Sequence, residues 1–426
     1  MFKDLNYMAR NNDNEQIDYL GNITIAQDQP LRGNALINAV IDRLGRDDCH
    51  TKIILGKKVL VYSTKGRKIV LLTKAITYLG NPHPIFKKRI QLPDWYQDFC
   101  KGVQEQNLPY DIRFLGVYHY QDTVLFVDFE KDTYLGRGLH NSSAHVYVND
   151  LFQALTYGVF RKQDKNDNYL TCIRADKILS YLNGESTEQD NNLFELFKRF
   201  NSGFTFGQWL KAIDAIREMH DNNWRNWRQT EWAGWFLEYR FDKFTHDSNI
   251  TDKMRYISQK KEGELDFDIR FEEADFYGDL KASDISKNEA PGNDQDNLVE
   301  CIYRYNKFWY VIYEHESIKD SVVGYTASAE RELFLHDVDP AFYGKLMERR
   351  EKEPDKVHGK DPKMKNQVKF VKMTIIELNK VNFRDALKIF AQGRQADGHA
   401  RKPKFSINKA TLDNDNYAVF RYTYKE

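Results

Sequence analysis

The sequence lacks several features that would place it in a membrane or a secretory pathway. No apolar run approaches the ~20 residues that a membrane-spanning helix needs, and the opening MFKDLNYMARNNDNEQ lacks the basic-then-apolar order of a signal peptide. Cysteine is scarce, and the four present form no C-x-x-C pair of the kind that binds structural zinc or cycles between redox states: Cys49, Cys100, Cys172 and Cys301. We therefore expect a soluble protein of the reducing cytoplasm, with no membrane partner.

The chain also has no excess of either charge. Lys and Arg together number 63, as do Asp and Glu. A net charge of zero argues neither for nor against nucleic acid, because binding depends on where the charges lie. Residues 262–279 are rich in acids, whereas lysine and arginine recur through 343–372. The first region suits a metal ion and the second suits phosphate, although a lysine-rich segment with interspersed acids is also typical of a solvated surface.

With 426 residues, the chain is too long for a single hydrophobic core, and its patterning predicts three parts. Residues 1–190 contain short β-prone runs separated by turn residues, such as KVLVYST, DIRFLGVYHY, TVLFVDFE and AHVYVNDLF, which predict an antiparallel, strand-rich domain. Gln121 and Asp122 lie where a tight hairpin would turn. Residues 191–330 predict an α/β core, and 331–426 a mixed, mostly helical, basic region. The overall class is then α+β.

The central part has an ordered series of patterns. Apolar residues at three-to-four spacing predict helices over 207–220 and 224–241. Two alternating segments, ELDFDIRF and FYGDLKAS, then predict strands joined by the turn EEAD. A loop that contains Pro291 and Gly292 comes next, and it leads to the helical pattern NLVECIYRYNK and then to the apolar run FWYVIYEH. The expected order is therefore strand, strand, helix, strand.

The two predicted strands carry carboxylates and a lysine. In ELDFDIRF, alternation places Asp266 and Asp268 on one face, and in FYGDLKAS it places Asp279 and Lys281 on one face. Pairing of the two strands would bring these groups to cross-strand distance. Hydrolysis of a phosphodiester needs carboxylates to hold a hard cation that neutralises charge and acidifies a water molecule. A neighbouring lysine orients that water or stabilises the transition state.

These segments resemble the PD-(D/E)XK nuclease superfamily, which includes most type II restriction endonucleases. The similarity covers about residues 224–315, with Asp279-Leu280-Lys281 as the D/E-x-K element. The resemblance implies an α/β/α nuclease core, Mg²⁺ as cofactor and Mn²⁺ as a substitute. It also implies that Asp266 binds the metal, that Asp279 is the second ligand and that Lys281 is the catalytic lysine. Asp268 is the alternative to Asp266 as the metal-binding aspartate.

Many members of this superfamily add a glutamate from the preceding helix, often in a G-x-x-x-E arrangement. Here Gly234-Trp235-Phe236-Leu237-Glu238 offers Glu238 as a further catalytic and metal-binding residue. Glu231 lies seven residues earlier, and therefore on the same helix face, which makes it the alternative.

A basic and aromatic segment in the amino-terminal part suits contact with DNA. Within NPHPIFKKRIQLPDWY, Lys87 and Lys88 would contact phosphate, and Arg89 phosphate or a guanine edge. A loop with packed aromatic rings and solvated lysines explains the same residues equally well.

The leading hypothesis is a Mg²⁺-dependent endonuclease that hydrolyses double-stranded DNA, of the type II restriction kind. Such enzymes usually act as homodimers, because two strands must be cut. One alternative keeps the chemistry but makes the protein a defence or repair nuclease that senses an effector or a DNA modification. The other is a nucleic-acid-binding protein without catalysis.

Overall fold

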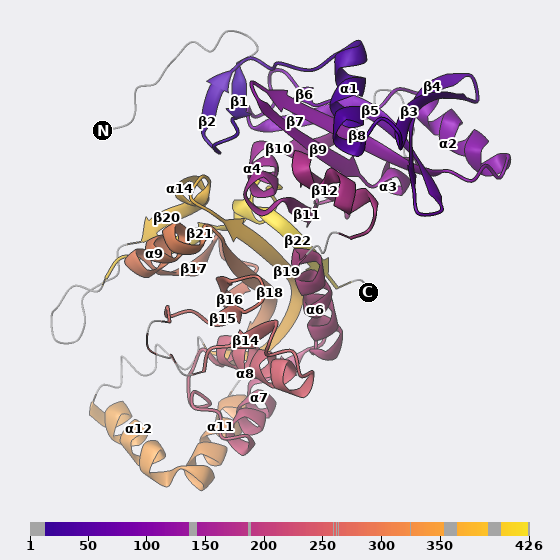
Figure 1. Ribbon diagram of the computed structural model, residues 1–426. Coiled ribbons are helices and arrows are strands. Elements are labelled where there is room, and N and C mark those ends of the chain that lie inside the picture. Colours follow the sequence, from indigo (N-terminus) through magenta and orange to yellow (C-terminus); the bar gives the residue numbers. More distant parts are fainter. Residues whose placement is uncertain are drawn as a thin grey trace. The chain divides into compact units, whose positions relative to one another are not determined.

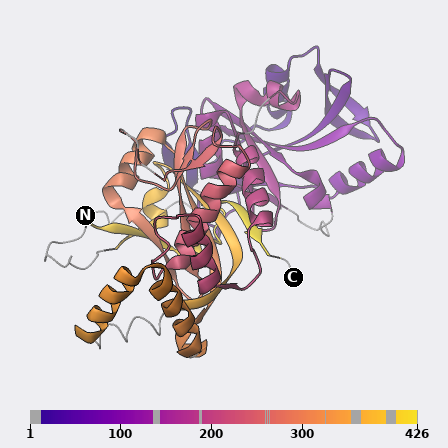
Figure 2. The same cartoon turned by 90° about the horizontal axis from the view of Figure 1, so that it is seen from below.

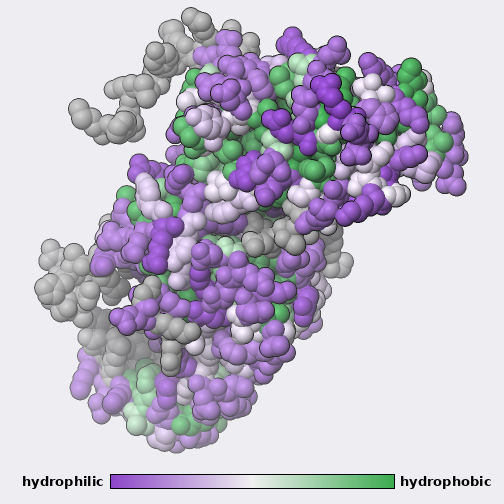
Figure 3. Space-filling view, viewed as in Figure 1, coloured by the Kyte–Doolittle hydropathy of each residue, from purple (hydrophilic) through white to green (hydrophobic). Residues whose placement is uncertain are grey.

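The computed structural model describes residues 13–135, 143–185, 189–258, 260, 262, 264–323, 325–352, 364–390 and 402–424. It divides into two units, Met1–Asn191 and Asn192–Glu426, each with its own sheets and helices (Figure 1). The fold is mixed α+β. Within the described ranges, no helix is long and apolar enough to cross a membrane. The visible face of unit 2 is largely hydrophilic (Figure 3).

In the main sheet of unit 1, most strands that pair with each other also follow each other in the sequence. Its spatial order is β11 (Val159–Gln163), β12 (Tyr169–Arg174), β9 (Thr123–Phe129), β8 (Asp111–Tyr120), β5 (Arg67–Ala75), β4 (Lys57–Thr64) and β3 (Cys49–Ile54). All neighbours are antiparallel except β5 and β8. The predicted hairpin is confirmed: Tyr120 pairs with Thr123 across Gln121 and Asp122, and Gln121 has φ of 49°.

Smaller elements complete unit 1. The other strands are β1 (Asn14–Ile17), β2 (Ile23–Ala26), β6 (Thr77–Tyr78), β7 (Lys87–Gln91) and β10 (Ser143–Tyr147). The helices are α1 (Gly33–Leu44), α2 (Trp95–Glu105), α3 (Lys131–Leu135), α4 (Val148–Tyr157), the 3₁₀ turn η1 (Ala175–Lys177) and α5 (Ile178–Leu182). Leu44 of α1 and Ile178 of α5 join a buried cluster with Leu71 and Leu115 of the main sheet.

One strand prediction in unit 1 is wrong. AHVYVNDLF does not form a single strand, because β10 ends at Tyr147 and α4 begins at Val148. The carboxylate of Asp150 accepts a hydrogen bond from the backbone N–H of Tyr147 at 2.9 Å and so caps the start of the helix. A side chain three residues ahead therefore overrides the β propensity of the valines.

Unit 2 is organised around a second sheet. Its spatial order is β13 (Leu210–Lys211), β19 (Lys365–Leu378), β18 (Phe308–Lys319), β16 (Phe276–Asp284), β15 (Ile269–Phe271) and β14 (Met254–Tyr256), with β22 (Ala418–Thr423) also paired to β19. Only β16 and β18 run parallel, and α9 (Gln295–Tyr305) lies between them in sequence. The predicted strand, strand, helix and strand are present as β15, β16, α9 and β18, with one further strand, β17 (Glu289–Asp294), between β16 and α9.

Helices and a small sheet cover the two faces of this sheet (Figures 1 and 2). Phe194 stacks on Trp309 at 5.3 Å between ring centroids, on the face covered by α6 (Gln189–Gly203), α7 (Ala212–Asp221) and α8 (Trp232–Asp247). On the other face, Leu298 of α9 is buried with Tyr310 of β18. That face also carries β17 (Glu289–Asp294), β20 (Leu387–Phe390), β21 (Lys404–Asn408), α14 (Phe383–Ala386) and the 3₁₀ turn η3 (Lys409–Thr411).

The structure corrects two further expectations in unit 2. The segment around Pro291 and Gly292 is not a loop but β17, which pairs with β21. A side chain at Gly292 would come within 2.5 Å of the carbonyl oxygen of Phe405, so the close approach of these strands requires glycine. The strand predicted over ELDFDIRF is reduced to β15, which begins only at Ile269.

The carboxy-terminal region is less helical than predicted. Three helices lie before or near residue 331, where this region begins: α10 (Asp320–Val323), α11 (Tyr325–Val338) and α12 (Pro340–Lys352). The strands β19 and β22 then join the central sheet. The end of β19, from Met373 to Leu378, is buried without interruption. A strand buried on both faces shows no alternation of polar and apolar residues, and such a run resembles a buried helix in sequence.

Candidate active site

The candidate site lies where β15 and β16 separate. Their backbone pairing starts at Phe271 and Phe276 and ends at Ile269 and Gly278. Beyond that point, the side chain of Asp268 replaces a backbone partner: its Oδ2 accepts a hydrogen bond from the N–H of Leu280 at 3.1 Å. In return, the N–H of Asp268 donates to Oδ1 of Asp279 at 3.3 Å. The two carboxylates are thereby held side by side.

Lys281 completes this pair as a cation. Its Nζ lies 2.5 Å from Oδ2 of Asp279, whose side chain is 1% exposed, while 18% of the Lys281 side chain remains exposed. Burial by itself would lower the pKa of Lys281, but the charges of Asp279 and Asp268 outweigh it and the pKa is raised. Lys281 therefore stays protonated at neutral pH.

Glu238 adds a carboxylate from α8. The hydroxyl of Tyr256 in β14 donates a hydrogen bond to it. Burial raises the pKa of Glu238 to about 7, and the charge of Asp279 acts in the same direction, whereas Tyr256 and Lys281 act against it. Glu231, by contrast, is exposed and lies 3.3 Å from Nζ of Lys365. The structure thus brings Glu238, and not Glu231, to the Asp279 cluster.

The structure places Asp268, rather than Asp266, beside Asp279. Asp266 is exposed at a bend before β15, and its backbone carbonyl accepts a hydrogen bond from the side-chain amide of Asn297 at 3.0 Å. The expectation that the two acids share a strand face assumed regular alternation from residue 264. Because β15 begins only at Ile269, that alternation does not apply to Asp266.

The cluster contains three carboxyl groups and one lysine, so its groups can be compared with those that hold a divalent cation. Burial raises the pKa of Asp268 well above its usual value, and the charges of Asp279 and Glu238 raise it further against the opposing effect of Lys281. In the described part of the chain, no three His, Cys, Asp or Glu side chains gather closely enough to hold a metal ion. Magnesium is nevertheless commonly held by only one or two carboxylates together with water and substrate phosphate. Asp268 and Asp279 fit that requirement.

Sequence reasoning missed four polar residues that act on the cluster or lie near it. Tyr256 orients Glu238, and Arg225 affects the same group, because its charge lowers the pKa of Glu238. The N–H of Asn293 in β17 donates to the hydroxyl of Tyr310 at 3.1 Å, and Oδ1 of Asn293 is buried without a hydrogen bond among the described residues. Burial, then the charge of Asp279, raises the pKa of Tyr310. No local pattern marks these residues, since their positions depend on distant contacts.

The basic residues predicted to contact DNA lie on β7 of unit 1, and the structure corrects the prediction for one of them. Lys88 is fully buried, with Nζ 2.9 Å from Oδ1 of Asp28, so its side chain does not reach a duplex. Lys87 and Arg89 are half-buried, and Arg89 donates to Oγ of Ser143 at 3.3 Å. Alternation along the strand gives the physical reason: Lys88 shares the inward face of Ile90.

Comparison with known families finds a match in unit 1. Residues 67–182 match the family model MTaX1, described as Methylase-associated X1. The matched segment runs from β5 to α5 and excludes the cluster around Asp268 and Asp279. No curated protein and no solved structure matches the chain.

Proposed function

We propose that this chain is a Mg²⁺-dependent endonuclease that hydrolyses phosphodiester bonds of double-stranded DNA, with a PD-(D/E)XK core in unit 2. The observation that carries the proposal is the mutual positioning of Asp268 and Asp279 next to Lys281, at the edge of a strand-helix-strand unit. The match of unit 1 to a methylase-associated family supports a place in a restriction-modification system, where a nuclease and a methylase act on the same DNA.

Each residue of the cluster has a distinct role in this proposal. Asp268 and Asp279 would hold the cation, which when bound would neutralise phosphate charge and lower the pKa of a water molecule. Glu238 supplies a further carboxylate, and Tyr256 fixes its orientation. Because Lys281 is protonated, it donates hydrogen bonds to the attacking water or to a phosphate oxygen and does not act as the base.

The direct test is cleavage of supercoiled and linear plasmid DNA by the purified full chain, with Mg²⁺, Mn²⁺, Ca²⁺ or EDTA. We expect cutting with Mg²⁺ and Mn²⁺ only, and its loss in Asp279→Asn. Glu273→Gln is the matched control, because it removes an exposed acid from the neighbouring turn. The proposal is falsified if Asp279→Asn, folded by circular dichroism, cuts at the rate of the unchanged chain. Sedimentation of the protein with and without DNA tests whether a homodimer forms.

A second candidate function is a nuclease that acts only after unit 1 senses a DNA modification or an effector. The position of the methylase-associated match, entirely within unit 1 and apart from the catalytic cluster, favours it. Plasmids prepared with and without base methylation distinguish the two functions. Discrete fragments from unmodified DNA support ordinary restriction, whereas cleavage only of methylated DNA supports sensing. DNA binding without cleavage under every condition would support the non-catalytic alternative.

A further inference from the structure

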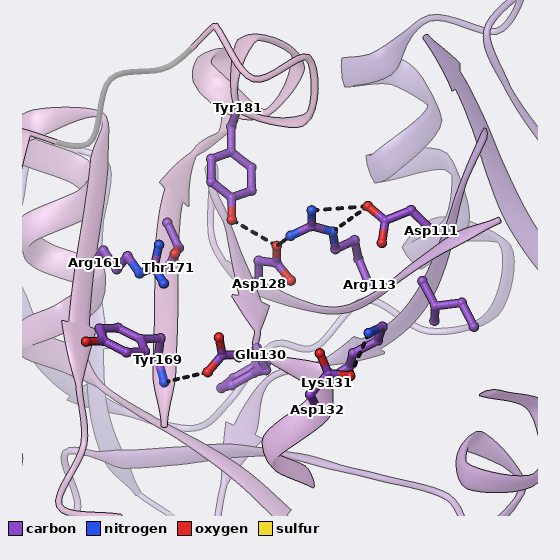
Figure 4. A pocket seen from close by; sticks show the side chains of 12 residues that line it. Asp111, Arg113, Asp128, Glu130, Lys131, Asp132, Arg161, Tyr169, Thr171 and Tyr181 are labelled. Carbon is purple, nitrogen blue, oxygen red and sulfur yellow. Dashed lines mark hydrogen bonds and ion pairs between the residues drawn. The ribbon is translucent and has the colours of Figure 1, made fainter. Parts of the chain in front are cut away.

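Unit 1 contains a polar hollow of about 270 Å³ on the main sheet (Figure 4). It lies across β8, β9, β12 and β11, which are neighbours in the sheet, and is bordered by α3 and α5. Thr171 faces Arg161 on one side and Asp128 on the other, so adjacent strands line up polar side chains on one face. The whole hollow falls within the segment that matches the methylase-associated family.

The floor of the hollow is a buried carboxylate held from two sides. Asp128 is 5% exposed, and its Oδ2 accepts hydrogen bonds from Arg113 at 3.0 Å and from the hydroxyl of Tyr181 at 2.9 Å. Nε of Arg113 also donates to Asp111 at 3.1 Å. Contacts from β8 and α5 thus fix an acceptor of β9 in advance of any ligand.

The charges in the hollow disfavour an anion. Arg113 is shared between two carboxylates, and Nζ of Lys131 lies 2.6 Å from Asp132. The lining also includes Glu130 and Arg161, so its four acids outnumber its three cations. A ligand that suits this surface is uncharged and offers hydrogen-bond donors to the carboxylates.

One wall of the hollow pairs a guanidinium with an aromatic ring. The guanidinium of Arg161 lies 4.4 Å from the centroid of the Tyr169 ring, and the N–H of Tyr169 donates to Glu130 at 3.4 Å. An aromatic wall next to a carboxylate suits a planar molecule that carries an amino group. Nucleobases stack on such rings, and Asp or Glu accepts hydrogen bonds from the amino group of cytosine.

We propose that this hollow binds a single nucleobase with an exocyclic amino group, cytosine or adenine, either extruded from DNA or presented as a free nucleoside. Its volume lies just below the ~300–1,000 Å³ of pockets for drug-sized ligands, which leaves room for one base and its sugar. Extruded bases are read in this manner, by hydrogen bonds to their edge and by stacking. An adjoining shallow hollow of about 650 Å³ shares Asp111 and Lys131 and adds Lys101 of α2, which provides space and a cation for the sugar and phosphate.

The experiment measures equilibrium binding to the full chain by calorimetry in EDTA, so that cleavage plays no part. The probes are cytidine, adenosine, uridine and thymidine, and single-stranded oligomers of deoxycytidine, deoxyadenosine and thymidine. We expect the amino-bearing probes to bind about tenfold or more tightly than the others, because only they can donate a hydrogen bond from an exocyclic amino group to the carboxylates. Preference among the nucleosides identifies a free ligand as the source, and preference among the oligomers alone identifies a base within DNA.

Matched variants connect this preference to the hollow. Glu130→Gln changes an exposed lining residue, and Asp122→Asn removes an acid from the turn at the other end of the same hairpin. We expect Glu130→Gln to lower affinity for the amino-bearing probes about tenfold and Asp122→Asn to leave it unchanged; Asp128→Asn repeats the test at the floor. Equal binding of all probes, no binding by any, or affinity unaffected by Glu130→Gln would overturn the proposal. Asp279→Asn should bind as the unchanged chain does, so this inference stands or falls separately from the nuclease.

Discussion

Asp268 and Asp279 fix each other through their backbones: the N–H of Asp268 donates to the Asp279 carboxylate, and the Asp268 carboxylate accepts the N–H that follows Asp279. Each carboxylate uses one oxygen in these contacts. Two acids would repel each other when placed side by side, so their position is maintained by hydrogen bonds and by the charge of Lys281. The arrangement distinguishes residues that are nearly equivalent in sequence, and it leads to the first prediction.

Asp268→Asn should reduce Mg²⁺-dependent cleavage by at least about a hundredfold, equivalent to several kcal/mol of transition-state stabilisation. Asp266→Asn should leave the rate within about threefold, because the Asp266 side chain is exposed and its hydrogen bond with Asn297 uses the backbone carbonyl. Initial rates of plasmid nicking compare the two variants directly. Equal losses in both would show that Asp266 also belongs to the site.

Lys281→Met should destabilise the protein without metal by about 3–5 kcal/mol, because Asp279 would remain buried and unpaired. A divalent cation held by Asp268 and Asp279 would replace the lost positive charge. We therefore expect Mg²⁺ to raise the unfolding midpoint of Lys281→Met more than that of the unchanged chain. Thermal unfolding with and without Mg²⁺ measures the difference, and cleavage should be lost in this variant because the hydrogen-bond donor is missing. An identical effect of Mg²⁺ on both proteins would contradict the prediction.

His315 should make stability depend on pH. His315 is fully buried in β18. This burial, together with the charge of Lys365, lowers its pKa to about 4. Its folded pKa is below the unfolded value, so its stabilising contribution is complete above about pH 6.5 and is lost as the pH falls towards 4, by up to roughly 3 kcal/mol. His315→Leu lacks this titration. Urea unfolding of both proteins at pH 7 and pH 4.5 should show the smaller loss in His315→Leu, and parallel losses would argue against it.

Lys88→Met should lower stability and leave DNA affinity unchanged. The lysine is fully buried and paired with Asp28, so its removal leaves a carboxylate without its partner, at a cost of about 3–5 kcal/mol. Lys87→Met at the neighbouring, half-buried position is the comparison. Urea unfolding and fluorescence anisotropy with a labelled duplex separate the two effects. A loss of DNA affinity in folded Lys88→Met would restore its predicted role in binding.

Local patterns in the sequence were sufficient for several parts of this protein. The turn at Gln121 and Asp122 follows from polar residues between two alternating runs, and the pairing of β15 with β16 follows from a short turn between two β-prone segments. The presence of α9 and β18 follows from their spacing of apolar residues. Such features depend on residues close in sequence, and for that reason their physics is visible in the sequence alone.

The tertiary structure decided which of several similar residues meet. Asp268 lies beside Asp279 because β15 is short, and Glu238 joins them because Tyr256 from another strand holds it. Lys88 is buried because its strand turns that face inward. Each of these three outcomes depends on hydrogen-bond partners and burial that distant segments supply, so none of them follows from local spacing alone. The sequence by itself thus determined the kinds of groups available for chemistry, whereas packing determined which of them share a site.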